Sequence, residues 1–296
     1  MSSQEVDLEL VEKVLIEVAL EAGEIIKNRN GFNTFDDKKN GVDLVTEVDK
    51  SVEVFINEKL ISKFPSYKFM GEESYVPGET KLTEAPTFIV DPIDGTTNFI
   101  HTFPYSCTSL GFTVNYEPVV GVIYNPHLNL LFHGVKGKGA YLNDKKLDNL
   151  SDRSLEFQKS LIALESGSER KGENFETKMI SYRNFLSEEK GFIHGFRSFG
   201  SAAMNICHVA LGAVDGYWEN CWAWDVCAAA VILRETGGLM LDGNKNEVGG
   251  EVREWNQEVP VDNRVYLIVR GAPKEDQKKW VETFYSLVEG KIVCTK

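Results

Sequence analysis

The sequence predicts an α/β protein built from layers of helices and sheets. Its opening segment carries apolar residues on one face at helical spacing, and residues 107–135 form a run of short apolar segments typical of antiparallel strands. The second half differs, because strand-like segments there are followed by helical ones. With 296 residues the chain can bury a large core, and we expect a single domain, residues 1–296, with halves of about 1–145 and 146–296.

Two helices are expected before the first strand. In the first, apolar residues between positions 11 and 26 share one face, and Gly31 is the expected end. The second covers about residues 46–64 and is closed by Pro65, which cannot continue a helix. A buried strand is expected at residues 87–90. An antiparallel group then follows at residues 107–115, 118–124, 130–135 and 140–142.

A polar stretch, residues 144–159, is the expected link to the second half of the chain. Strands are predicted there at residues 161–164, 192–196 and 265–269. Helices are predicted from Gly200 to about residue 211, over 224–236 up to Gly237-Gly238, and over 274–287.

The composition narrows the possible partners and the location. A formal net charge of −13 argues against nucleic acid or an anionic membrane as a partner. No apolar run reaches the ~18 residues that a membrane-spanning helix needs. The first residues show no basic region followed by an apolar stretch, so we expect a cytoplasmic protein. The five cysteines form no Cys-x-x-Cys pair, which favours reduced thiols over a disulfide framework or a zinc site.

The most informative segment is Asp-Pro-Ile-Asp-Gly-Thr-Thr-Asn, residues 91–98, directly after an apolar strand. Two carboxylates three residues apart can hold hard cations such as Mg²⁺, which prefers oxygen ligands. Pro92 fixes the backbone between them, and Gly95 lets the main chain approach a ligand. Free amides that open the next turn can receive an anion. The pattern is suited to metal-assisted phosphate chemistry, in which the metal would supply the positive charge that this acidic chain lacks.

This segment has two other interpretations. A lone Asp-Gly-Thr can be a loop in which Asp and Thr act only as caps. The phosphatases that use an aspartyl nucleophile carry Asp-x-Asp-Gly-Thr. Here Pro92 stands two residues before Asp94, so that spacing fails and a covalent aspartyl mechanism is disfavoured.

Residues 88–101 resemble the first signature of the inositol monophosphatase family. Residues 224–229, continuing to Gly237-Gly238, resemble its second signature, and Gly-Glu-Glu-Ser at 71–74 sits where the family places a metal-binding glutamate. The resemblance covers nearly the whole chain. It implies an αβαβα sandwich of the inositol monophosphatase and fructose-1,6-bisphosphatase type. It also implies Mg²⁺-dependent hydrolysis of myo-inositol monophosphate to myo-inositol and phosphate, by in-line attack of a metal-activated water.

The resemblance further implies the residues of the site, which would hold two or three Mg²⁺ ions. The catalytic residues would be Asp91, which bridges two metals, and Glu72 and Thr96, which orient the water. The metal ligands would be Glu72, Asp91, the Ile93 carbonyl, Asp94 and Asp225. The residues that contact substrate would be Glu72, Ile93, Asp94, Gly95, Thr96, Gly200, Ser201, Ala202, Glu219 and Asp225. Of these, Glu219 matches a carboxylate that hydrogen-bonds sugar or inositol hydroxyls.

Several of these residues also have simpler interpretations. Without the family, Glu72 would be a solvated surface charge. Asp225 and Ser201 would be caps at helix starts. Thr46 and Asp49 match a capping box, which is our preferred interpretation, although the family places an aspartate here behind the metal ligands.

One segment departs from the family pattern. Residues 220–223 carry no histidine where some members have one near the substrate, and Trp222 and Trp224 could reshape the pocket wall. Alternative substrates are therefore other sugar or nucleotide phosphates, such as fructose 1,6-bisphosphate or a 3′-phosphoadenosine nucleotide. A non-catalytic regulatory member is disfavoured, because no catalytic carboxylate is missing. The resemblance also implies inhibition by Li⁺ and a homodimer, for which apolar strands at residues 89–112 could supply the interface.

Overall fold

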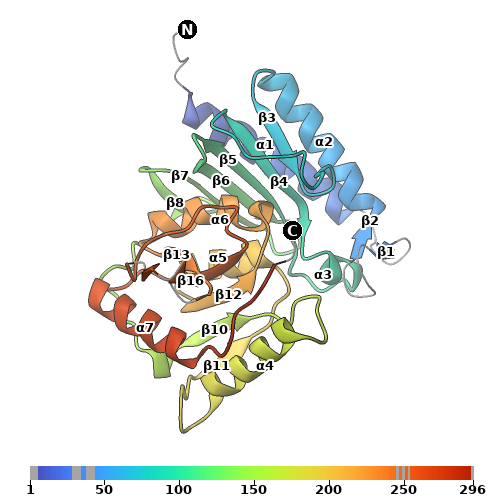
Figure 1. The fold of residues 1–296 in the computed structure, drawn as a ribbon. Helices are drawn as coiled ribbons and strands as arrows, with labels where there is room; N and C mark the ends of the chain where they lie inside the picture. Colours follow the sequence, from blue (N-terminus) through green and yellow to red (C-terminus); the bar gives the residue numbers. More distant parts are fainter. Residues whose placement is uncertain are drawn as a thin grey trace.

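The structure is a computed structural model with five stacked layers in the order helix, sheet, helix, sheet, helix (Figure 1). This arrangement confirms the expected αβαβα sandwich. Two predictions, the absence of a secretory signal in the first five residues and a helix end at Gly31, lie outside the described residues. The described residues are 6–28, 35–37, 44–244, 247–248, 251–252 and 254–294.

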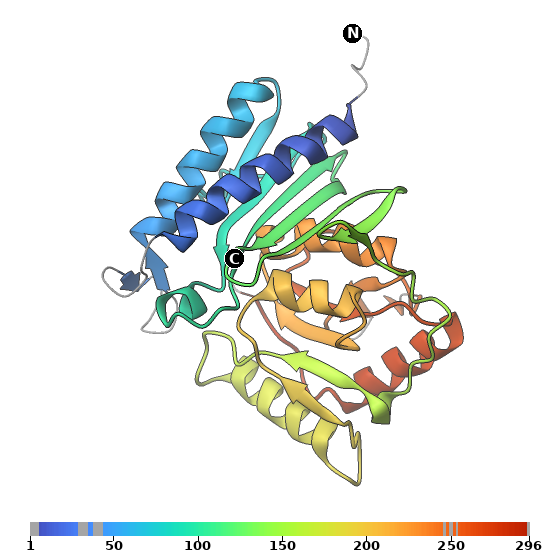
Figure 2. The same cartoon turned by 180° about the vertical axis from the view of Figure 1, so that it is seen from behind.

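The first layer consists of α1 (Leu8–Lys27) and α2 (Glu47–Lys63), which lie side by side over one face of the first sheet (Figure 2). Asp7 caps α1 by accepting a hydrogen bond from the Leu10 amide at 3.0 Å. A short antiparallel pair, β1 (Phe35–Asp37) and β2 (Leu44–Thr46), precedes α2. The predicted apolar faces of both helices are buried against the sheet, which confirms the two helices.

The first sheet has seven strands in sequential order, with β3 and β4 parallel and all later neighbours antiparallel. The antiparallel group expected from the sequence is therefore confirmed. A short helix, α3 (Thr96–Ile100), leaves the sheet after β4. The strands are β3 (Lys68–Gly71), β4 (Thr87–Asp94), β5 (Cys107–Val114), β6 (Glu117–Asn125), β7 (Leu130–Val135), β8 (Gly139–Leu142) and β9 (Lys145–Lys146).

Strand β4 runs four residues past its expected end at Val90 and includes both motif aspartates. Its pairing with β5 is irregular there, because Asp91 faces Ser109 while Asp94 faces Cys107. Pro92 has no amide proton for a regular ladder and therefore suits this irregular stretch. The irregularity changes the alternation of side chains, so that two carboxylates three residues apart can face the same site.

The second sheet has the strand order β11-β10-β12-β16-β13. The third layer, α5 (Ala202–Ala210) and α6 (Ala223–Glu235), lies between the sheets, and α4 (Glu173–Leu186) and α7 (Lys274–Leu287) form the last layer (Figure 1). The remaining elements are β10 (Leu161–Leu164), β11 (Gly195–Arg197), β12 (Gly216–Asn220), β13 (Leu239–Asp242), β14 (Glu247–Val248), β15 (Glu251–Val252), β16 (Val265–Val269) and the 3₁₀ turn η2 (Phe157–Lys159). Helix α4, strands β12, β13, β14 and β15 and the turn η2 were not predicted. The strand predicted at residues 192–196 lies instead at Gly195–Arg197, because Phe192, with a φ of +46°, ends a turn.

Helix α6 is buried along most of its length and packs on the inner face of the first sheet. Its close approach depends on a glycine in β6, because a Cβ at Gly121 would lie 2.1 Å from the Ala228 carbonyl oxygen. This packing sets the first turn of α6, which carries Asp225, beside the end of β4. Asp225 of the second half thereby lies beside the motif aspartates of the first half.

The strands that could have supplied a subunit interface are instead interior. Ile89 and Phe112 are fully buried within a single copy of the chain, where helices cover both faces of the first sheet. The suggested place for that interface is therefore wrong. Among the helices of the described ranges, none is both long and apolar enough to cross a lipid bilayer. All five cysteines carry free thiols.

Candidate active site

Four acidic side chains meet at the junction of the two halves. Asp91 and Asp94 come from β4, Glu72 follows β3 directly, and Asp225 lies in the first turn of α6. Carboxylate oxygens of the three aspartates lie within 4.8 Å of one another, and Glu72 lies beside Asp91. Asp91 and Asp94 are only 2% and 7% exposed. The structure thus gathers the four carboxylates that the family resemblance assigned to metal binding.

This gathering is electrostatically unfavourable without a cation. Burial raises the pKa of Asp91 well above its ordinary value, and repulsion from Glu72, Asp94 and Asp225 raises it further. Burial raises the pKa of Asp225 well above its ordinary value, and repulsion from Asp94 and Glu72 adds to the rise. The pKa of Asp94 is raised by burial, although hydrogen bonds from Ser201 and two backbone amides oppose the rise. An all-oxygen donor set with excess negative charge fits a hard divalent cation such as Mg²⁺.

The turn after β4 is shaped around Gly95. Its φ of +91° lies in the left-handed region, and a Cβ there would lie 3.0 Å from the carbonyl oxygens of Gly200 and Tyr105. The Ile93 amide donates to Asp91 Oδ1 at 3.0 Å and holds that carboxylate in place. The motif therefore fixes the direction of its carboxylates through its own backbone.

Asp49 supports this turn from α2. Its carboxylate is 1% exposed, and the Thr96 hydroxyl lies 3.1 Å from Asp49 Oδ1 and 3.1 Å from the Ile93 carbonyl oxygen. Because this hydroxyl carries a single proton, one of these two oxygens can accept from it at a time. The contact puts Asp49 directly behind the motif. The capping-box interpretation involves the side chain of Thr46, which lies outside the described part of the chain.

The start of α5 is tied to Asp94. The Ser201 hydroxyl donates to Asp94 Oδ2 at 2.5 Å and accepts from the Met204 amide at 3.4 Å, so the predicted cap is confirmed. The amides of Ala202 and Ala203 also donate to Asp94, at 3.2 and 2.7 Å. Asp94 is therefore oriented by the same helix start that the sequence assigned to substrate contact.

Asp225 also has the capping role expected from its place in the sequence. Its Oδ2 accepts a hydrogen bond from the Trp222 amide at 2.6 Å, at the start of α6. One carboxylate oxygen is thereby fixed by the backbone, while the side chain stays within the acidic cluster. The cap and a metal-ligand role are compatible, because a carboxylate has several lone pairs.

A cavity of about 770 Å³ borders the acidic cluster and is large enough for a small sugar phosphate. Glu72 and Asp225 form part of its wall on the cluster side. Glu219, on β12, lines the same cavity and is 6% exposed. Of the residues expected to contact substrate, the lining includes Glu72, Gly200, Ser201, Ala202, Glu219 and Asp225.

Trp222, in the segment that departs from the family pattern, and Trp224, at the start of the second signature, both form part of this wall. The rings of Trp222 and Trp224 stack with centroids 5.0 Å apart and planes 11° from parallel. The Arg264 guanidinium lies 3.2 Å from the centroid of the Trp222 ring, and its Nε donates to the Cys221 carbonyl oxygen at 3.0 Å. Arg264 was not predicted; it reaches the wall because β16 pairs with β12.

A second residue missed by the sequence reasoning is Glu165, which follows β10. Its carboxylate accepts from the Ser198 hydroxyl at 2.6 Å, the Phe199 and Gly200 amides at 2.9 Å each, and the Asn205 side chain at 2.8 Å. These bonds hold the loop that leads into α5. A lone glutamate after an apolar strand carries no sequence signal for this task.

We predict that Glu165→Ala will lower kcat/KM by about 10²-fold, because the loss of three hydrogen bonds to the loop before α5 and one to α5 itself misplaces the cavity wall. Steady-state kinetics together with thermal unfolding would check this. Glu156→Ala, which removes an exposed glutamate paired with Lys159, is the matched control and should leave kcat/KM within about twofold. An equal loss in both variants would contradict the role assigned to Glu165.

Comparisons with known proteins agree with this geometry. The family model described as "Inositol monophosphatase family" matches residues 7–289. The chain is 56% identical over 293 residues to "Inositol monophosphatase 2" of Saccharomyces cerevisiae, covering 96% of this chain and 97% of the relative. It is 50% identical to "Inositol monophosphatase 1" of the same yeast, over 96% and 98% of the two chains. The solved structure of inositol monophosphatase from Anabaena (Nostoc) sp. PCC 7120 superposes with a TM-score of 0.73 at 26% identity, over 96% of this chain and 98% of that one. The chain therefore belongs to the inositol monophosphatase family.

Proposed function

We propose that this protein is a Mg²⁺-dependent phosphatase that hydrolyses myo-inositol monophosphate to myo-inositol and phosphate. The observation that carries the proposal is the cluster of Glu72, Asp91, Asp94 and Asp225 beside a cavity of sugar-phosphate size. The two yeast relatives that match nearly the whole chain are named inositol monophosphatases, which supports the same reaction class.

The four carboxylates and the Ile93 carbonyl would hold two or three Mg²⁺ ions. When bound, such ions supply positive charge that polarises a phosphate and lowers the pKa of water. Glu72 and Thr96 would orient the attacking water, and the Thr96 hydroxyl lies 3.1 Å from Asp49 Oδ1. The Gly95 and Thr96 amides would donate to phosphate oxygens.

The rest of the substrate would lie along the cavity. Ser201, Ala202 and Gly200 border it on one side, and Glu219 is the candidate acceptor for hydroxyl groups of the polyol. Two arginines, Arg170 and Arg264, also line the cavity, but they are outnumbered by acidic side chains. This balance favours a substrate with one phosphate and several hydroxyls.

The proposal extends to properties beyond the reaction itself. We propose that residues 1–296 act as one domain, since Asp225 of the second half completes a site with Asp91 of the first. The proposal includes inhibition by Li⁺ and a homodimer, both of which the family resemblance implies. A cytoplasmic location is supported by the five free thiols, which suit a reducing compartment.

A substrate panel tests the proposed substrate. Phosphate release would be compared for myo-inositol 1-phosphate, fructose 1,6-bisphosphate and 3′-phosphoadenosine 5′-phosphate at equal Mg²⁺ concentration. We expect the highest kcat/KM for the inositol ester. A higher kcat/KM for either of the other two esters would show that the inositol ester is not the preferred substrate. The proposed metal chemistry would still stand.

Metal removal should have a measurable effect on stability. The protein treated with EDTA keeps four neighbouring carboxylates without a counter-charge, so Mg²⁺ should raise its unfolding temperature. At a free Mg²⁺ concentration about 100 times Kd, the expected stabilisation is about 2.7 kcal/mol. Differential scanning calorimetry would measure the shift. Asp91→Asn should reduce it, and an unfolding temperature that is independent of Mg²⁺ would contradict the metal site.

A further inference from the structure

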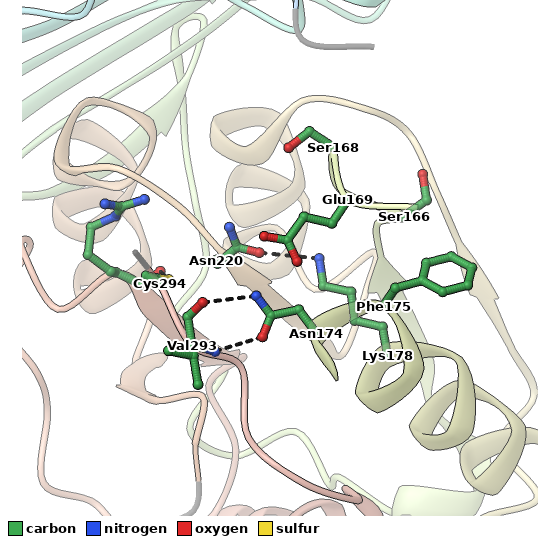
Figure 3. A pocket seen from close by; sticks show the side chains of 10 residues that line it. Ser166, Ser168, Glu169, Asn174, Phe175, Lys178, Asn220, Val293 and Cys294 are labelled. Atoms are coloured by element: carbon green, nitrogen blue, oxygen red, sulfur yellow. Dashed lines mark hydrogen bonds between the residues drawn. The ribbon is translucent and has the colours of Figure 1, made fainter. Parts of the chain in front are cut away.

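A buried ion pair lies next to the proposed polyol site. Lys178, from α4, donates to Glu219 Oε1 on β12, and the two side chains are only 4% and 7% exposed. The Lys178 ammonium also lies 3.3 Å from Asn220 Oδ1, and Figure 3 shows it pointing from α4 toward Asn220. Burying two charges costs desolvation that their attraction barely repays, so stability alone is a weak reason for such a pair.

The hydrogen bonds of Glu219 are divided unequally between its two oxygens. Oε1 accepts from Lys178 and from the Asn220 amide at 2.8 Å. Oε2 is buried and has no hydrogen-bond partner among the described residues. A buried carboxylate oxygen without a donor is costly. Because Glu219 lines the large cavity, a hydroxyl group bound there could be that donor.

Lys178 approaches Glu219 from a different cavity. It lines a small cavity of about 50 Å³ that Asn174 helps to close by exchanging hydrogen bonds of 2.9 and 2.8 Å with Val293 (Figure 3). Gly167 passes over the ammonium, since a Cβ there would lie 2.8 Å from Lys178 Nζ. The lysine therefore contacts Glu219 without lining the substrate cavity.

We propose that Lys178 is a positioning residue that sets the preference for polyol esters. It fixes Glu219 through Oε1 and leaves Oε2 for a substrate hydroxyl. This inference rests on the proposed function. The ammonium also compensates the buried charge: burial raises the pKa of Glu219, and Lys178 opposes that rise. Without the lysine, the carboxylate would lose both its orientation and its partner charge.

Lys178→Met tests the inference. We expect KM for myo-inositol 1-phosphate to rise about tenfold with kcat within about twofold, because one charge-assisted hydrogen bond to the substrate is weakened. Phenyl phosphate has no hydroxyl group for Glu219, so its kcat/KM should change by less than about twofold. Lys159→Met is the matched control. It removes an exposed lysine that pairs with Glu156 at 2.8 Å, and it should leave kcat and KM unchanged for both substrates.

A double-mutant cycle tests whether the effect passes through Glu219. In the Glu219→Gln background, Lys178→Met should raise KM for the inositol ester by less than about twofold. Lys178→Gln, which keeps a neutral donor on a side chain one bond shorter, is the second variant if Lys178→Met fails to fold. It should show the same selectivity between the two substrates, with a smaller rise in KM for the inositol ester.

Three results would overturn the inference. The first is an equal loss on both substrates, and the second is no loss on either. The third is that Lys178→Met raises KM for the inositol ester by the full factor of about ten in the Glu219→Gln background as well. A wild-type enzyme that hydrolyses phenyl phosphate but not the inositol ester would overturn the proposed substrate and this inference together, and it is recognisable before any variant is made.

Discussion

Asp91→Asn should lower kcat by about 10³-fold and leave the fold intact. Asparagine keeps the oxygen that accepts from the Ile93 amide at 3.0 Å, so the local backbone has no reason to move. It removes the charge at the centre of the acidic cluster, where Glu72, Asp94 and Asp225 all face Asp91. Metal-held charge stabilisation is worth several kcal/mol in a transition state, which corresponds to this loss of rate.

The measurement is kcat at saturating Mg²⁺ together with thermal unfolding in EDTA. The variant without metal should unfold at a temperature no lower than the wild type, because one of several repelling charges is gone. Asp148→Asn, an exposed aspartate in the link between the two halves, is the matched control for the loss of one charge. Turnover near the wild-type value in Asp91→Asn would disprove the assignment of this site.

Gly95→Ala should be nearly as damaging to activity, with a loss of about 10²-fold in kcat/KM. Its φ of +91° already strains any side chain, and the added Cβ would meet the carbonyl oxygens of Gly200 and Tyr105 at 3.0 Å. The turn must therefore shift, and Asp94 and Thr96 on either side shift with it. A displacement of about 1 Å in a catalytic group can cost this much.

Gly137→Ala separates backbone strain from collision. Gly137 has a φ of +77° with open space around it, so alanine there costs only the left-handed strain of about 1–2 kcal/mol. Its kcat/KM should stay within about twofold of the wild type. If the two alanine variants are equally active, the proposed shape of the motif is wrong.

The sequence predicted best those elements whose own pattern is strong. Strands β7, β10 and β16 and helix α7 occupy the predicted residues, because apolar runs or a clear amphipathic face define them. Helix α4 was missed since its buried residues include Thr177, Lys178 and Ser181, which leave no apolar stripe to recognise. Its polar inward face makes sense only in the tertiary structure, where Lys178 meets Glu219.

The candidate site likewise contains residues that a local sequence pattern marks and residues whose role only tertiary contacts reveal. The motif aspartates, Asp91 and Asp94, lie three residues apart in one segment, and their spacing carries chemical meaning by itself. Glu165 and Arg264 are single charged residues, and only tertiary contacts give them a role: the loop before α5 for Glu165, and the pairing of β12 with β16 for Arg264. Register between distant strands sets such contacts, and local patterns do not encode it.

The most direct test of this account is phosphate release from myo-inositol 1-phosphate as a function of Mg²⁺ concentration, using enzyme first stripped with EDTA. We predict no measurable turnover without metal and a saturable return of activity as Mg²⁺ is added, with Asp91→Asn inactive throughout. Full turnover by the stripped wild-type enzyme would contradict the central claim that the acidic cluster works by holding metal.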